Sequence, residues 1–168
     1  MLIHINRKKF LHITAIGTGM LFLSPAPGNT QQQNQGNKPP ALSPELVKDF
    51  VIAGHGNLDK VKELLAKEAG LLNACWDWGG GDFETAIEGA GHTGSKDCAN
   101  YLLSKGARMN IFCAAMLGRL DIVKAFLLDY PELKTSKGPH GLQLMHHATK
   151  GGDNAKEVLA YLQSVGAM

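Results

Sequence analysis

The feature that most restricts the fold of this chain is a pattern that occurs four times: a glycine followed by a segment whose apolar residues have helical spacing. The shared glycines are Gly56, Gly94, Gly118 and Gly152, which lie 38, 24 and 34 residues apart. Small residues before each glycine allow two helices to approach closely, and we expect each glycine to supply a positive φ between them. One helix pair cannot bury such an apolar face alone, so the pattern predicts a stack of pairs.

The four segments resemble the ankyrin repeat. Residues 114–128 are the closest match, with two alanines, two variable residues, a glycine and a helix ending in leucines. Residues 85–88 and 143–146 stand where the family has Thr-Pro-Leu-His, and His146 retains the histidine. The resemblance implies an all-α ankyrin-repeat solenoid of about four helix-turn-helix units. Their expected bounds are 46–78, 82–110, 111–138 and 141–168.

The interval of 24 residues between the second and third glycines is about ten residues short of the ankyrin period of about 33. We therefore expect the hairpin between these two units to be shortened to a tight turn at Asn110.

A helix start is predicted at Ser43-Pro44-Glu45, because serine is a good N-cap, proline fits the first turn and an acid favours the positive end of the helix dipole.

The N-terminal region looks like an export leader followed by a tether. Basic residues cluster in the first twelve positions, and residues 13–23 form an apolar run too short to span a bilayer. Residues 6–12 also resemble a twin-arginine motif, with Lys8 in place of the second arginine. We expect a bacterial protein that is periplasmic or secreted, the alternative being a plain cytoplasmic N-terminus. The expected domains are a signal peptide over 1–26 (Sec or twin-arginine-like), a disordered linker over 27–41 and the repeat domain over 42–168.

The charge balance argues against nucleic acid as a partner. The chain has 17 basic and 15 acidic side chains, but Arg7, Lys8 and Lys9 belong to the leader. The rest is therefore close to neutral, whereas phosphate binding needs a basic face. We expect the partner to be another protein, with no membrane contact after leader removal, and a monomeric chain.

Cysteine and histidine spacing predicts no metal site and no cofactor. Three cysteines without CxxC spacing form neither a zinc cluster nor a complete disulfide framework. We expect Cys98 and Cys113 to be buried small side chains, although one disulfide stays possible in an oxidising compartment. His140, His146 and His147 are close in sequence, but adjacent histidines on a helix point to different faces.

Known catalytic motifs are missing from the sequence, which contains no GxSxG, HExxH or phosphate-binding loop. Asp77 and Asp82 are paired acids, but they belong to a glycine-rich finger that would fix their separation poorly. We therefore expect a protein that is not an enzyme.

The long finger at residues 73–84 is the strongest candidate for partner binding, because tryptophan is enriched where interface energy concentrates. In the alternative interpretation, Trp76 and Trp78 fold back and cover the adjacent core. The predicted contact face comprises Trp76, Asp77, Trp78, Asp82, Phe83, Glu84, His55, His92, Thr93, Met116, Leu117 and Arg119. We expect a non-catalytic scaffold for protein–protein interaction. The alternatives are an accessory, chaperone-like stabiliser of a periplasmic enzyme and a host-directed secreted effector.

Overall fold

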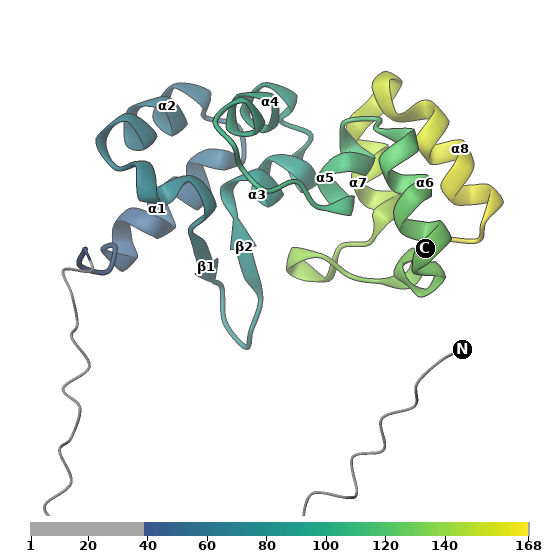
Figure 1. Cartoon of the computed structure of the whole chain (residues 1–168), viewed down its shortest axis with the longest axis horizontal. Coiled ribbons are helices and arrows are strands. Elements are labelled where there is room, and N and C mark those ends of the chain that lie inside the picture. Colours follow the sequence, from purple (N-terminus) through teal and green to yellow (C-terminus); the bar gives the residue numbers. More distant parts are fainter. Residues whose placement is uncertain (1–38, 168) are drawn as a thin grey trace, which may run out of the picture. The chain divides into compact units, whose positions relative to one another are not determined.

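The computed structural model describes residues 39–167, and its compact unit, which begins at Pro40, is mostly helical (Figure 1). The elements in chain order are α1 (Pro44–Gly54), α2 (Leu58–Lys67), η1 (Ala69–Asn73), β1 (Cys75–Asp77), β2 (Phe83–Thr85), α3 (Ala86–Thr93), α4 (Lys96–Ser104), α5 (Ile111–Met116), α6 (Leu120–Asp129), η2 (Pro131–Thr135), η3 (Pro139–Gly141), α7 (Leu144–Gly151), η4 (Gly152–Ala155) and α8 (Lys156–Ser164). The predicted signal peptide and most of the predicted linker lie outside the described residues.

Helix α1 begins where the sequence predicted it. Ser43 is the N-cap, and its hydroxyl oxygen accepts a hydrogen bond from the backbone N–H of Leu46 at 3.4 Å. Pro44 occupies the first turn, where no intrahelical N–H is needed, and Glu45 lies at the positive end of the dipole. Three adjacent residues therefore determine this helix start locally.

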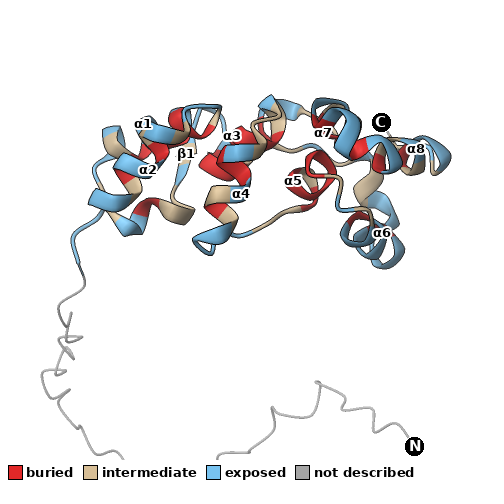
Figure 2. Ribbon diagram, turned by 90° about the horizontal axis from the view of Figure 1, so that it is seen from above, coloured by how far each residue is buried: buried red, intermediate tan, exposed pale blue. Residues whose placement is uncertain are grey.

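The helices form four pairs in which each member packs against the next: α1 with α2, α3 with α4, α5 with α6 and α7 with α8. The first helices of the pairs, α1, α3, α5 and α7, also contact one another in succession and form one row (Figure 2). Buried apolar side chains fill the unit in two clusters, one around Phe50, Leu71 and Leu102 and the other around Val123, Leu144 and Leu162. Each pair thus buries its apolar face against its neighbours.

Glycines allow neighbouring helix pairs to approach closely. A Cβ on Gly54 would lie 2.3 Å from the backbone oxygen of Ala86, and one on Gly118 would lie 1.9 Å from that of Asn154. Gly118 also has a φ of +71°, as predicted for a glycine between the helices of a pair. The same prediction is wrong for Gly56, which has no positive φ, because the turn after α1 continues through His55 with right-handed helical dihedrals.

The finger between the first two pairs is an antiparallel hairpin of β1 and β2, in which Trp76 pairs with Glu84. Gly79, Gly80 and Gly81 all have positive φ at its tip, so the turn uses a backbone conformation that side chains rarely adopt. No strand lies between α4 and α5, which are joined by residues 105–110 alone. The connection is therefore shortened, as predicted, and Asn110 caps α5 by accepting a hydrogen bond from the N–H of Cys113 at 2.8 Å.

Candidate functional site

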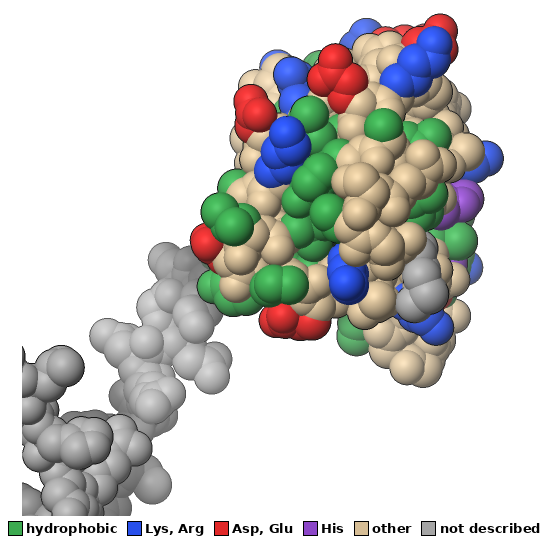
Figure 3. Space-filling view, turned by 90° about the vertical axis from the view of Figure 1, so that its right-hand side faces the viewer, with side chains coloured by type: hydrophobic (Ala, Val, Ile, Leu, Met, Phe, Trp, Pro, Cys, Tyr) green, Lys and Arg blue, Asp and Glu red, His purple; other side chains and the backbone are tan. Residues whose placement is uncertain are grey.

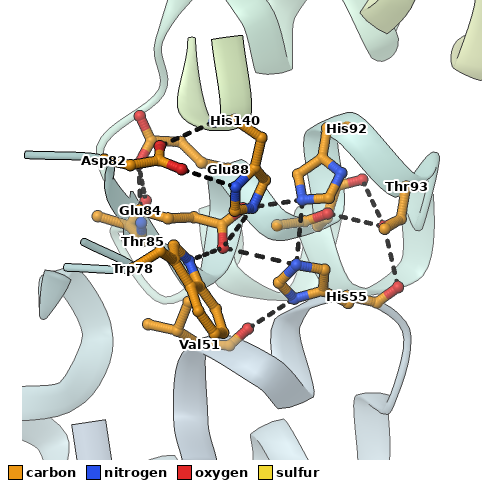
Figure 4. Close-up of polar contacts among 12 residues, drawn as sticks. Val51, His55, Trp78, Asp82, Glu84, Thr85, Glu88, His92, Thr93 and His140 are labelled. Carbon is orange, nitrogen blue, oxygen red and sulfur yellow. Dashed lines mark hydrogen bonds and ion pairs between the residues drawn. The ribbon is translucent and has the colours of Figure 1, made fainter. Parts of the chain in front are cut away.

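Four titratable side chains from separate parts of the chain converge beside the hairpin (Figure 4). They are His55 after α1, Glu84 in β2, His92 in the last turn of α3 and His140 in η3. One possible ligand atom from each residue lies within 4.8 Å of those from the others. We call this group the histidine–glutamate cluster.

Glu84 lies at the centre of the histidine–glutamate cluster. The alternation of β2 turns it inward, so its side chain is 0% exposed while the neighbouring Phe83 is exposed. Its Oε2 accepts a hydrogen bond from Trp78 Nε1 at 2.8 Å, and its Oε1 lies 2.8 Å from Nε2 of His92. Burial raises the pKa of Glu84, but the contacts with His92 and Trp78 and the charge of His55 outweigh it, so the net pKa is lowered and the carboxylate stays ionised.

His55 is held in one orientation by backbone on two sides. Its Nδ1 lies 3.0 Å from the carbonyl oxygen of Val51, one turn earlier in α1, so Nδ1 carries a proton and donates it. Its Nε2 faces Glu84 Oε2, 3.5 Å away. Gly89 of α3 makes room for the ring, because a Cβ there would lie 2.8 Å from the imidazole Cε1 and Nδ1.

His140 reaches the cluster from a different part of the chain and is fixed by Asp82. The backbone N–H of His140 donates to Asp82 Oδ1 and its Nδ1 donates to Oδ2, both at 2.8 Å. His140 has a φ of +58°, an uncommon conformation for a residue with a side chain. Its Nε2 lies 3.5 Å from Glu84 Oε2. The hydrogen bond from the backbone N–H of His140 is the largest cause lowering the pKa of Asp82, which therefore stays charged.

His92 completes the cluster. Its Nε2 lies 3.0 Å from Nε2 of His55 and 2.8 Å from Oε1 of Glu84. Only one proton fits on that nitrogen, and Oε1 has no partner with hydrogen-bond geometry. A cation bound between these atoms would satisfy both, so this group of side chains is suited to hold a metal ion.

No family model matches the sequence. A search of curated proteins likewise found no match, so the assignment of function depends on the residues and geometry of this chain. None of the helices in the described part of the chain is long and apolar enough to cross a membrane.

The structure brings several predicted contact residues together. His55, His92, Glu84, Asp82 and Trp78 all belong to the cluster or contact it directly. The Thr93 hydroxyl donates to the backbone oxygen of His55 at 2.9 Å, so Thr93 ties the ends of α1 and α3 together beside the cluster.

Other predicted contact residues lie outside the cluster. Trp76 is half-buried against the core, as the alternative interpretation had it, whereas Trp78 is 37% exposed. Asp77 and Phe83 are exposed on the hairpin.

Three predicted contact residues belong to the third helix pair and lie away from the hairpin. Met116 is fully buried and Leu117 is 9% exposed, so the prediction that these two contact a partner is wrong. Both residues stand at the end of α5, where the resemblance to ankyrin repeats implies an exposed surface, but their side chains pack into the core instead. Arg119 is exposed between α5 and α6 and stays a prediction.

His146 and His147 lie outside the histidine–glutamate cluster, although they are close to His140 in sequence. His146 Nε2 instead lies 2.9 Å from the backbone oxygen of His92, and His147 is 1% exposed with Nδ1 2.9 Å from the carbonyl oxygen of Gln143. Burial lowers the pKa of His147 to about 4, so this ring is neutral at physiological pH. The only local signal for the role of His140 was its position after Gly138-Pro139, a turn sequence.

Exposed apolar side chains also occur far from the hairpin. The end of the unit that carries α8 shows a group of apolar side chains with charged residues along the upper edge (Figure 3). On α6, Phe126 is 39% and Leu128 is 80% exposed. These side chains serve below as controls for the hairpin.

Proposed function

We propose that residues 42–168 form an ankyrin-type repeat stack that acts as a non-catalytic scaffold binding another protein, as an exported monomer. The row of first helices and the hairpin leading into α3 support the ankyrin assignment, because this family stacks helix pairs side by side with hairpins between them. The near-neutral charge outside the leader supports a protein rather than a nucleic acid as the partner.

The observation that carries the proposal is an exposed aromatic surface on an anchored hairpin. Phe83 is 57% and Trp78 is 37% exposed, while Glu84 in β2 is fully buried and hydrogen-bonded to Trp78. An aromatic side chain on a support that does not move loses little conformational entropy when a partner covers it. The hairpin therefore has the properties of an interface hot spot.

A groove beside the hairpin extends this surface. Its apolar lining comes from Phe83, Phe112 and Pro139. Its charged lining comes from two acids, Asp82 and Glu88, and one base, Lys137. A partner segment with one apolar side chain and mixed charge fits this lining. The burial of Glu84 supports the non-catalytic part of the proposal, because a side chain that is 0% exposed does not meet a substrate from solution.

The test uses the full chain as bait for proteins of a periplasmic extract, followed by affinity measurement on the identified partner. Phe83→Ala is expected to weaken binding by about 30-fold or more, since hot-spot truncations cost about 2 kcal/mol or more. Leu128→Ala, which removes an equally apolar and more exposed side chain from α6, is the matched control. Equal losses in both variants, or none in Phe83→Ala, would contradict a contact face on the hairpin.

The identity of the partner separates the two narrower functions. A periplasmic enzyme whose thermal inactivation is slowed by this chain supports an accessory stabiliser. A eukaryotic protein bound with the same dependence on Phe83 supports a host-directed effector.

A further inference from the structure

We propose that His55, Glu84, His92 and His140 form a binding site for one divalent transition-metal ion, with zinc(II) as the best fit to the donor set. This site is independent of the scaffold function proposed above. It joins the end of α1, the hairpin, α3 and the loop before α7 (Figure 4).

The spacing of the ligand atoms fits a single small ion. Zinc binds histidine nitrogen and carboxylate oxygen at about 2.0–2.2 Å, so neighbouring ligands of a tetrahedral site lie about 3.3 Å apart. Nε2 of His92 lies 3.0 Å from Nε2 of His55 and 2.8 Å from Glu84 Oε1. Nε2 of His55 and Nε2 of His140 each lie 3.5 Å from Glu84 Oε2. These four separations lie within about 0.5 Å of the tetrahedral value, and one ligand atom from each of the four residues lies within 4.8 Å of the others.

The protonation pattern also favours a metal ion over a network of hydrogen bonds. Nδ1 of His55 faces the Val51 carbonyl and Nδ1 of His140 faces Asp82, so the neutral form of each ring turns an unprotonated Nε2 inward. A proton on His92 Nε2 serves either His55 or Glu84, and the buried Oε1 is left without a hydrogen-bond partner. A divalent cation satisfies all four groups at once and offsets the charge of the buried carboxylate.

The residues around the ligands are those that metal sites need. A ligating histidine usually donates its second N–H to a carboxylate or backbone carbonyl, which fixes the ring and its tautomer. Asp82 does this for His140, and the Val51 carbonyl does it for His55. Trp78 Nε1 donates to the Glu84 carboxylate, and the missing Cβ of Gly89 leaves space for the His55 ring.

Three imidazoles and one carboxylate define the metal class. Magnesium and calcium prefer all-oxygen sites, whereas imidazole suits zinc, copper and nickel. Four protein ligands without a position for substrate are typical of a structural zinc site. The bound ion would hold the hairpin against α1 and α3. Its role would therefore be to make the hairpin rigid, and not to take part in a reaction.

The experiment is calorimetric titration of the chelator-treated full chain with zinc(II), copper(II) and magnesium(II). One zinc ion per chain is expected, with no heat from magnesium. His140→Asn is the main variant, because asparagine tolerates the left-handed backbone at this position but lacks the imidazole. Its affinity for zinc is expected to fall by at least about tenfold, the smallest loss typical for removal of a residue that merely supports a ligand.

Two control variants keep the histidine content comparable. His146→Ala removes a nearby ring outside the cluster, and the double variant His4→Ala/His12→Ala removes the leader histidines. Both are expected to bind zinc as the unaltered chain does. Circular dichroism of each variant establishes that it is folded.

Cobalt(II) in place of zinc reports the geometry, because a four-coordinate site gives intense visible absorption that His140→Asn should lose. The proposal is overturned if the unaltered chain binds no zinc, or if His140→Asn binds it as tightly as His146→Ala does. Tighter binding of copper(II) than zinc(II), with the same dependence on His140, would keep the site and follows the general order of affinities.

Discussion

Asp82 and His140 lie 58 residues apart in the chain and are joined by two hydrogen bonds of 2.8 Å, one to the backbone N–H and one to the ring Nδ1. Asp82 belongs to the hairpin turn before β2, and His140 belongs to η3. This contact places a third imidazole beside Glu84, and both the site geometry and the groove next to Phe83 depend on it.

Asp82→Asn is expected to weaken zinc binding by about 10–100-fold, because the amide does not hold the proton of His140 on Nδ1 as a carboxylate does. The measurement is zinc titration together with nitrogen NMR of the His140 ring, which reports its tautomer. Asp77→Asn is the matched control, since Asp77 lies in the same hairpin and accepts a hydrogen bond from the N–H of Gly79 instead. An Asp82 variant with unchanged tautomer and affinity would show that Asp82 does not position His140.

Gly89→Ala and Gly54→Ala distinguish a local change at the His55 ring from a change in the packing of α1 against α3. A Cβ on Gly89 meets the His55 imidazole at 2.8 Å, so the ring has to move while the helix gains about 1 kcal/mol in propensity. A Cβ on Gly54 meets the backbone of Ala86 at 2.3 Å, so α1 and α3 have to separate, at a cost of about 1–3 kcal/mol.

The stability of the two glycine variants is measured by denaturant unfolding in the absence of metal. Their affinity for zinc is measured by titration. We expect Gly89→Ala to lose zinc affinity with little loss of stability. Gly54→Ala is expected to lose both stability and zinc affinity, because separating α1 from α3 also moves His55 away from His92. A Gly89 variant that binds zinc normally would mean that the His55 ring needs no such space.

Because His147 is buried as a neutral ring, the protein is expected to lose stability in acid. Its pKa is lowered from 6.5 to about 4 by burial, so the unfolded chain binds a proton that the folded chain does not between these values. The contribution of this ring is thus fully present above pH 6.5 and is lost as the pH falls toward 4, by at most about 3 kcal/mol. Urea unfolding of the unaltered chain and of His147→Gln at several pH values measures it. The difference in the free energy of unfolding between the two proteins should shrink as the pH falls. A difference that stays constant would show that His147 is not buried as a neutral ring.

Thiol reactivity tests the burial of the cysteines. Cys98 and Cys113 are free thiols, and both are fully buried, as predicted from the sequence. Burial raises the pKa of Cys113 to about 12. Cys75 is exposed, although burial of part of its thiol raises its pKa too. We expect an aromatic disulfide reagent to modify Cys75 alone in the native protein and all three cysteines in denaturant. Cys75→Ser should leave no native reactivity, and rapid modification of that variant would contradict the core packing around α4 and α5.

Much of the fold was predictable because its signals are local. Ser43 and Pro44 start α1, and the shortened interval before Gly118 predicted the missing hairpin between α4 and α5. The candidate site was only partly predictable. His55, His92 and Glu84 were assigned to a contact face, but Met116 and Leu117 were placed on it wrongly, because the end of α5 packs into the core instead of facing solvent.

The sequence by itself determined where helices begin, which residues cap them and that their apolar faces need neighbouring pairs, because hydrogen-bond capping and helical periodicity act within a few residues. Only the tertiary structure decided that His140 belongs with His55, Glu84 and His92 rather than with His146 and His147. Their ligand atoms come from four elements, and their convergence depends on how closely α1 approaches α3 and on where Asp82 holds the loop. The spacing of residues along the chain does not predict distances between side chains of different elements.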